Sequence, residues 1–297
     1  MQHSTPEDLR QLGREDYPSL LREIPDPPKT LWMRGTWPPE GTRFLAVVGS
    51  RAATAYGKEA VAKLVSGLAG YPVSIVSGLA LGIDGAAHHA ALAAGIHTLA
   101  IPGSGLDDSV LYPRTHHGLA QKILAQGGAL LSEHEGKYRA RPYDFPSRNR
   151  IMVGLAHAVL VVEAGERSGT LITARLAGEY NRELLCVPHR IGDPHSFGAH
   201  LFLRLGATLV TESAHILEAL RIPLHTQEAA PSIPPDLSEP ERVVYTLLSQ
   251  PLPRDALIRA TKLPTQETLS ALISLELRGL VREEFGAWRH VSRKGRS

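Results

Sequence analysis

Four short segments rich in glycine and serine carry the residues most suited to holding an anion. They are Gly49-Ser50-Arg51, Ser77-Gly78 with Gly82 following, Gly103-Ser104-Gly105, and Ser168-Gly169-Thr170. Glycine lets backbone N–H groups approach an anion closely, and a helix that begins after such a loop adds roughly half a positive charge. Glycine is also needed for tight strand-to-helix turns in any α/β protein, so one loop alone fits a structural role equally well. Four such loops together favour a phosphate-binding site at one edge of a β-sheet.

A basic and aromatic segment adds to these loops. Residues 137–150 contain five Lys or Arg and one acid, a local charge of +4, with aromatic residues interleaved. Arg148 and Arg150 flank Asn149, which supplies several phosphate donors pointing in different directions. Phe145 offers a stacking face, and aromatic rings beside arginines are typical of sites for single-stranded nucleic acid. The alternative is that Phe145 belongs to the core and the arginines form surface ion pairs.

Other chemistries fit the sequence less well. The first loop lacks the Gly-x-Gly-x-x-Gly of a dinucleotide site, and no Gly-Lys-Ser/Thr of a P-loop occurs. Asp107-Asp108 offers two carboxylates, which we expect in solvent. The pairs His88-His89 and His116-His117 point to different sides of a helix or turn, which disfavours a metal site. Cys186 lies in an apolar run and predicts a buried thiol. We therefore expect no catalytic residue, metal or cofactor.

The stretches between these motifs predict the elements that must position them. From Phe44 onward, short apolar runs alternate with Ala-rich amphipathic stretches. The runs predict strands at 44–48, 73–76, 97–101, 129–131, 158–162, 184–187 and 208–210. Helices are expected between them, for example at 57–69, 83–94 and 214–220. Because the runs are almost continuously apolar, residues 44–222 should form an α/β, doubly wound, mostly parallel Rossmann-like sheet covered on both faces.

Three further regions complete the expected organisation. Residues 1–43 are rich in proline and predict a wrapping segment, and residues 223–237 contain four prolines without periodicity and predict a linker. Residues 238–292 predict a small winged-helix domain, with a Ser238-x-x-Glu241 capping box, helices at 254–260 and 265–279, and a strand pair within 280–291. The polar positions of its third helix are not basic, which slightly favours a protein-interaction or structural role over DNA reading.

Composition sets the broad class of protein. The 297 residues are 43% hydrophobic and 21% charged, with a net charge of +2, as in an ordinary globular protein. The apolar runs are far shorter than the ~20 residues of a membrane-spanning helix, and the first ten residues have no signal-peptide core. Together with the single cysteine, these features predict a cytoplasmic protein that does not contact membranes.

Taken in order, the motifs closely resemble those of the DNA-processing protein A (DprA/Smf) family. They are Val48-Gly49-Ser50-Arg51, Ser77 to Asp84, Gly103-Ser104-Gly105 with Tyr112-Pro113, Ser132-Glu133, Phe145-Pro146-x-Arg148-Asn149-Arg150-Ile151, and Glu163-Ala164 with Ser168 to Ala174. The resemblance runs from about Tyr17 to the end of the sequence. It implies a Rossmann-like domain followed by a winged helix.

The resemblance also implies a function and a set of site residues. The expected protein is not an enzyme; it binds and protects incoming single-stranded DNA in natural transformation and promotes loading of RecA. Phosphates would be held by Gly49, Ser50, Arg51, Ser77 and Gly78. The strand would be contacted by Phe145, Arg148, Asn149 and Arg150, with further amides from Ser168, Gly169 and Thr170. Family members typically dimerise through the Rossmann domain, so a homodimer is expected.

The sequence departs from the family pattern where dimer and RecA contacts are expected, between Gly198 and Thr211. The family tends to have Gly-x-Asn there, whereas this chain has Gly198-Ala199-His200. Two other functions stay open. One is a nucleotide-processing enzyme similar to the phosphoribohydrolases, although the loop at Ser168 lacks the glutamate that those enzymes carry. The other is a winged-helix transcription regulator.

Overall fold

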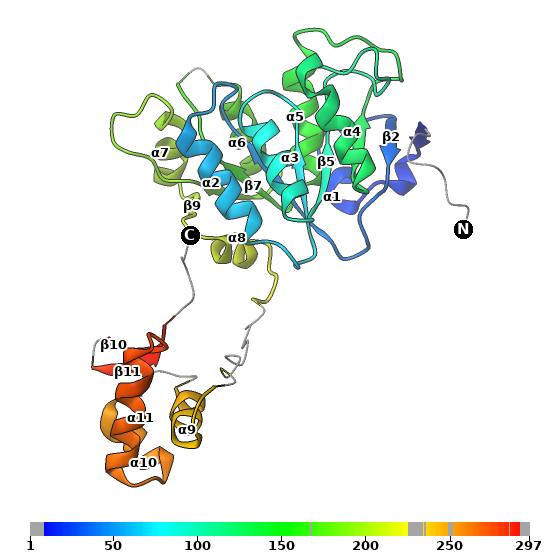
Figure 1. The fold of residues 1–297 in the computed structure, drawn as a ribbon. Helices are drawn as coiled ribbons and strands as arrows, with labels where there is room; N and C mark the ends of the chain where they lie inside the picture. The colour runs from blue at the N-terminus through cyan, green and yellow to red at the C-terminus, as the bar shows by residue number, and fades with distance from the viewer. Residues whose placement is uncertain are drawn as a thin grey trace. The chain divides into compact units, whose positions relative to one another are not determined.

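The computed structural model describes residues 9–166, 168–224, 234, 236–248, 252–284 and 286–291. The chain forms two compact units, Met1–Leu224 and His225–Ser297, each of which is described by itself (Figure 1). No helix within the described ranges is both long and apolar enough to cross a membrane.

A nine-stranded sheet in the order β1-β2-β6-β5-β4-β3-β7-β8-β9 runs through the first unit. Its parallel strands are β3 (Arg43–Val48), β4 (Val73–Ser77), β5 (His97–Ala100), β6 (Ala129–Ser132), β7 (Ala158–Val161), β8 (Glu183–Cys186) and β9 (Thr208–Leu209). These are the seven strands that the apolar runs predict, so the mostly parallel α/β class is confirmed. The Cys186 side chain is fully buried, as expected.

Helices cover both faces of this sheet because alternate side chains of each strand point in opposite directions. In β3, Phe44, Ala46 and Val48 face one core, which also contains side chains of α1 (Ser19–Arg22), α5 (Asp144–Leu155), α6 (Thr170–Glu179) and α7 (Phe197–Arg204). Leu45 and Val47 face a second core with α2 (Ala55–Ser66), α3 (Ile83–Ala93) and α8 (Ser213–Ala219). A third cluster packs α4 (His117–Ala125) beside β5 and β6 (Figure 1).

The first 43 residues do more than wrap around the domain, which corrects the expectation from sequence. They supply β1 (Arg10–Leu12) and β2 (Leu31–Gly35), with β2 antiparallel to β6 and β1 antiparallel to β2. Tyr17, Leu21 and Ile24 are buried in the first core. The strand Leu31–Gly35 contains no β-branched residue, and its partner β6 lies far along the chain, so the sequence pattern gives it no signal.

The order of the strands creates a crevice at one point of the sheet. The chain passes from β3 through β4 and β5 to β6, and then returns to place β7 on the other side of β3. The connections that leave β3 and β7 therefore diverge at the carboxyl ends of these two strands. Such a switch point is where open parallel sheets bind their ligands.

The second unit has the order of a winged helix. Its elements are α9 (Glu239–Leu247), α10 (Arg254–Thr261), α11 (Thr265–Leu277), β10 (Val281–Glu284) and β11 (Ala287–His290). Val244, Leu257, Leu275 and Trp288 form its core. The three predicted helices and the strand pair are therefore confirmed, whereas most of the predicted linker at 223–237 lies outside the described residues. Two short 3-10 helices, Arg14–Asp16 and Arg114–His116, complete the elements.

Glu241 joins two helices of this second unit. Its carboxylate accepts the Ser238 N–H at 2.8 Å, as the capping box requires, and the Ser274 hydroxyl donates to its other oxygen at 2.5 Å. Arg278 lies 3.7 Å away. The Ser274 hydroxyl, followed by the Ser238 donors, lowers the pKa of Glu241 from its usual 4.5 to about 2.

We expect the winged-helix unit to lose stability in acid because of this carboxylate. The unfolded chain binds the proton near pH 4.5, whereas folded Glu241 binds it only near pH 2, so its stabilising effect is present above pH 4.5 and is lost as the pH falls toward 2. Urea unfolding from pH 7 downward would measure this through the fluorescence of Trp288, the sole tryptophan after Trp32→Phe and Trp37→Phe. Glu241→Gln should flatten the pH dependence, and exposed Glu267→Gln should not. An equally steep loss in Glu241→Gln would contradict the assignment.

Candidate functional site

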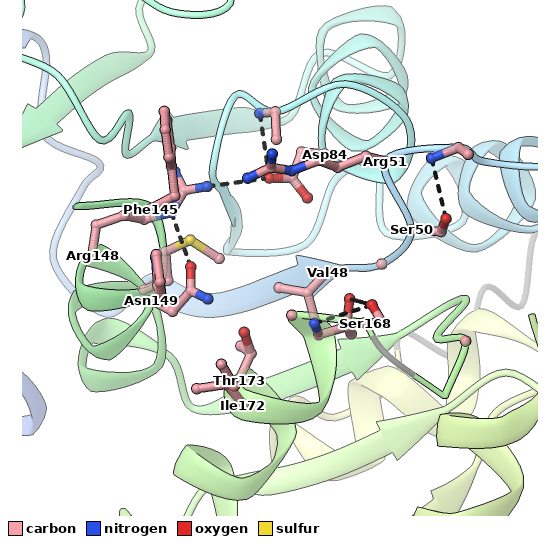
Figure 2. A pocket seen from close by; sticks show the side chains of 18 of the residues that line it. Val48, Ser50, Arg51, Asp84, Phe145, Arg148, Asn149, Ser168, Ile172 and Thr173 are labelled. Carbon is pink, nitrogen blue, oxygen red and sulfur yellow. Dashed lines mark hydrogen bonds and ion pairs between the residues drawn. The ribbon is translucent and has the colours of Figure 1, made fainter. Parts of the chain in front are cut away.

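A cavity of about 920 Å³ opens at the carboxyl ends of β3 and β7 (Figure 2). Side chains reach it from five segments of the first unit: residues 48–52, 80–84, 142–152, 165–173 and 194–195. Nine of the twelve residues predicted to bind DNA line it, and these are Gly49, Ser50, Arg51, Phe145, Arg148, Asn149, Ser168, Gly169 and Thr170. The switch point of the sheet and the sequence motifs therefore coincide.

The loop from β3 to α2 is held by a buried carboxylate. Fully buried Glu163 accepts the N–H of Thr54 at 3.1 Å and also the Thr54 hydroxyl. Thr54 in turn accepts the N–H of Gly57 at 3.1 Å and so begins α2. Since Glu163 follows β7, this contact fixes the loop of one strand to the end of the other.

Gly49 and Ser50 occupy the start of this loop. A Cβ on Gly49 would lie 2.6 Å from Cγ1 of Ile83, so glycine allows β3 to end against the start of α3. The Ser50 hydroxyl oxygen accepts the N–H of Ala52 at 3.1 Å, which shapes a tight turn. The turn leaves the Arg51 side chain exposed at the cavity.

Arg51 and Phe145 meet at the cavity. The Arg51 guanidinium carbon lies 5.4 Å from the centroid of the Phe145 ring, within the range of a cation–π contact. Phe145 is half-buried and lies in the first turn of α5, where the buried carboxylate of Asp144 accepts the N–H of Arg141 at 2.7 Å. A Cβ on Gly103 would lie 2.9 Å from the Phe145 ring. The loop at Gly103, predicted among the phosphate-binding loops, thus supports the ring and does not line the cavity.

Arg148 lies in the floor of the cavity and is buried. It donates to the carbonyl oxygens of Gly78, at 2.5 Å, and Ile101, and its guanidinium lies 3.8 Å from the carboxylate of Asp84. Burial lowers the pKa of Arg148 to about 10, opposed by Asp84, so it remains charged at neutral pH. Burial also raises the pKa of Asp84, opposed by Arg148 and by the N–H groups of Ala80 and Gly78.

The remaining residues predicted in this region differ in their access to the cavity. Asn149 lines it and accepts from Nε of Arg148 at 3.0 Å. Arg150 does not line it, and it donates to Glu133 at 2.6 Å and to Asp26 at 3.0 Å. Arg148 and Arg150 are two residues apart on α5, so their side chains point about 200° from each other. This explains why Arg148 lines the cavity and Arg150 does not.

Ser77 and Gly78 lie behind the cavity surface. The buried Ser77 hydroxyl donates to the carbonyl of Val47 at 2.7 Å, and the Gly78 N–H donates to Asp84 at 3.0 Å. Both groups are thus engaged inside the protein. Direct contact of Ser77, Gly78 or Arg150 with a ligand stays a prediction that the geometry does not favour.

The loop from β7 to α6 forms the opposite side of the cavity. The Ser168 hydroxyl donates to Oγ1 of Thr170 at 2.9 Å and accepts the Thr170 N–H at 3.2 Å. Figure 2 shows Ser168, Ile172 and Thr173 on this side. Twelve further lining residues were not predicted from sequence, among them Ala80, Asp84, Met152, Ile172, Thr173 and His195. Helical spacing from Arg148 to Met152 and from Thr170 to Thr173 could have found two of them.

The cavity combines two loops that contain glycine and serine, an exposed guanidinium, a half-buried aromatic ring and apolar side chains such as Met152. This set fits a molecule with both phosphates and flat aromatic groups. No cluster of three metal-ligating side chains occurs in the described part of the chain.

We expect Arg148 to be required mainly for the stability of the first unit. Arg148→Ala removes one partner of a buried pair and leaves Asp84 unpaired, which should lower the free energy of unfolding by about 3–5 kcal/mol. Urea unfolding of the full chain would measure it, with exposed Arg139→Ala as a matched control within about 0.5 kcal/mol of wild type. An unchanged midpoint for Arg148→Ala would show that the pair does not hold the fold.

Comparison with known proteins places both units in one family. Residues 9–221 match the family model described as DNA recombination-mediator protein A, and residues 227–286 match the DprA winged helix domain. Protein Smf of Escherichia coli (strain K12) is 41% identical over 274 residues, which is 90% of this chain and 73% of that protein.

Two solved structures agree with this result. DNA processing protein A of Streptococcus pneumoniae has a TM-score of 0.66 and 38% identity, covering 71% of this chain and 74% of that chain. DNA processing protein A of Helicobacter pylori, described for its single-stranded DNA binding mode, has a TM-score of 0.63 and 29% identity, covering 73% of this chain and 98% of that chain.

Proposed function

The chain belongs to the DNA recombination-mediator protein A family, and from that premise we propose that its first unit binds single-stranded DNA in the cavity between β3 and β7. The observation that carries this proposal is the contact between the exposed Arg51 and the half-buried Phe145. The guanidinium neutralises a phosphate, while the ring stacks on a base of the same strand. The chain acts by binding the strand and not by converting it.

Phosphates would lie against the loops on either side of Arg51. Gly49 and Ser50 from one loop, with Gly169 and Thr170 from the other, line the cavity. In this proposal the backbone amides of Gly49, Ser50 and Gly169 meet the phosphates, since the Thr170 N–H already donates to Ser168. In this proposal Asn149 and Ser168 add polar side-chain contacts. Arg148, Ser77 and Gly78 act from behind by holding these groups in place.

Binding of this kind is tolerant of sequence and depends strongly on salt. Every base has a face that can stack on Phe145, and neutralised phosphates release counterions, so affinity falls as salt rises. Duplex DNA binds less well because its bases are already stacked on one another.

We expect Arg51→Ala and Phe145→Ala both to weaken binding of single-stranded oligonucleotides, but in different ways. Arg51→Ala removes one phosphate contact, so the slope of log K against log salt should fall by about 1. Phe145→Ala should cost about 1–3 kcal/mol with an unchanged slope, because it removes stacking only. Fluorescence anisotropy across a salt series, with a duplex of equal length, measures both effects.

Arg22→Ala is the matched control, because exposed Arg22 lies in α1, which packs against Gly154 near the far end of α5. It should bind as wild type does. Equal affinity for duplex and single strand, or wild-type binding by both site variants, would contradict the proposed function.

We further propose that the chain acts as a homodimer that passes its strand to RecA in natural transformation. Membership of a recombination-mediator family supports this role. Exposed apolar side chains near one edge of the sheet support the dimer: Phe197 is 43%, Leu205 72% and Leu209 47% exposed. They lie within or beside α7 and β9. Leu205 and Leu209 fall in the region 198–211, where the sequence predicts such contacts, and Phe197 immediately precedes it.

Leu205→Asp should therefore convert the dimer to a monomer, since an interface cannot bury an unpaired carboxylate without a large cost. Size-exclusion chromatography with light scattering measures the mass. Ile273→Asp, at a residue 54% exposed in α11, is a control of the same kind and should leave the dimer intact. A wild-type protein that is monomeric at micromolar concentration would contradict the proposal.

A further inference from the structure

An exposed aromatic ring continues the site beyond the cavity. Tyr112 is 52% exposed and does not line the cavity, but its ring centroid lies 5.4 Å from that of Phe145, with the two planes tilted by 48°. Phe145 thus contacts the Arg51 guanidinium, which lines the cavity, and the Tyr112 ring, which lies outside it.

The backbone around Tyr112 is fixed, so the ring is presented at a defined place. Its neighbours Leu111 and Pro113 are both buried, and Leu111 packs in the cluster beneath α4. His116 Nδ1 is hydrogen bonded to the carbonyl of Leu79 at 2.8 Å, which ties the segment to the loop between β4 and α3. Within the described ranges the Tyr112 hydroxyl forms no hydrogen bond, so the ring is placed by its buried neighbours and by its contact with Phe145.

The tilt between the two rings suits an unstacked strand. Neighbouring bases in a duplex are stacked on one another, with a rise of about 3.4 Å along each strand. The planes of Phe145 and Tyr112 are tilted by 48°, so two bases that stack on these rings are tilted likewise and cannot also stack on one another. A single strand permits this arrangement and a duplex does not.

From this geometry, and resting on the proposed function, we propose that Tyr112 is a second base-stacking residue. It receives the base next to the one on Phe145 and so sets the direction in which the strand leaves the cavity. Tyr112 contributes no positive charge, so its effect is on stacking and on preference for single strands, not on the number of phosphates neutralised.

The test uses the full chain and short oligothymidylates that carry one 2-aminopurine, a base whose fluorescence is quenched by stacking, at each position in turn. Wild type should quench the probe at two adjacent positions. Tyr112→Leu should lose the quenching at one of them and keep it at the other, with affinity lowered about 5- to 150-fold and an unchanged salt slope. Tyr112→Phe should restore both.

Tyr143→Leu is the matched control. Tyr143 is 58% exposed, but it does not line the cavity, and its hydroxyl accepts a hydrogen bond from Nη1 of Arg141 at 2.9 Å. This variant should quench as wild type does. Quenching at both positions in Tyr112→Leu, or the same loss in Tyr143→Leu, would overturn the role of Tyr112.

The outcomes separate this inference from the proposed function. If Arg51→Ala and Phe145→Ala weaken binding while Tyr112→Leu leaves quenching unchanged, the cavity binds DNA and only the role of Tyr112 is wrong. If wild type does not bind single strands, both proposals are wrong.

Discussion

The buried contact between Arg148 and Asp84 is the constraint on which the site depends. A guanidinium away from water must have its donors satisfied, and here the carbonyls of Gly78 and Ile101 and the amide oxygen of Asn149 accept from it, while the Asp84 carboxylate lies 3.8 Å away. Gly78 and Ile101 follow β4 and β5, and Asp84 lies in the first turn of α3, so one side chain of α5 joins the ends of two strands and the start of a helix. Gly78 has to be glycine, because a Cβ there would overlap the guanidinium.

The internal contacts of the charged side chains also determine which of them remain available to a ligand. Arg148 and Arg150 both donate to groups within the protein, and the Glu163 carboxylate accepts from Thr54. Arg51, among the described residues of the cavity, keeps an exposed guanidinium. Phe145 precedes Arg148 by three residues and so lies on the same side of α5. Arg148 therefore helps to position the Phe145 ring, which the exposed Arg51 contacts.

Much of this arrangement could be predicted from sequence, for identifiable reasons. Parallel strands buried on both faces are continuous apolar runs, so β3 to β9 were visible, and loops that follow such strands necessarily meet at one edge. The strand Leu31–Gly35 was not visible because it has no such run. The sequence also does not predict that Arg51 is exposed while Arg148 is buried and Arg150 is paired with acidic side chains. Arg148 is buried because it donates to the carbonyls of Gly78 and Ile101. These residues are far from it in the chain, so the local sequence around the arginines does not show which of them is buried.

The pairing of β3 with β7 has a consequence for how the protein is made. Leu45 lies opposite Ala158, so more than a hundred residues must be synthesised before the two sides of the crevice can meet. Contacts between such distant segments form slowly, after local helices and hairpins. A ribosome-bound chain that ends before β7 has its first glycine loop but no crevice. Under the proposed function, a chain that has not yet placed β7 beside β3 has no site for the strand, so the crevice is usable only after the second half of the domain has been made.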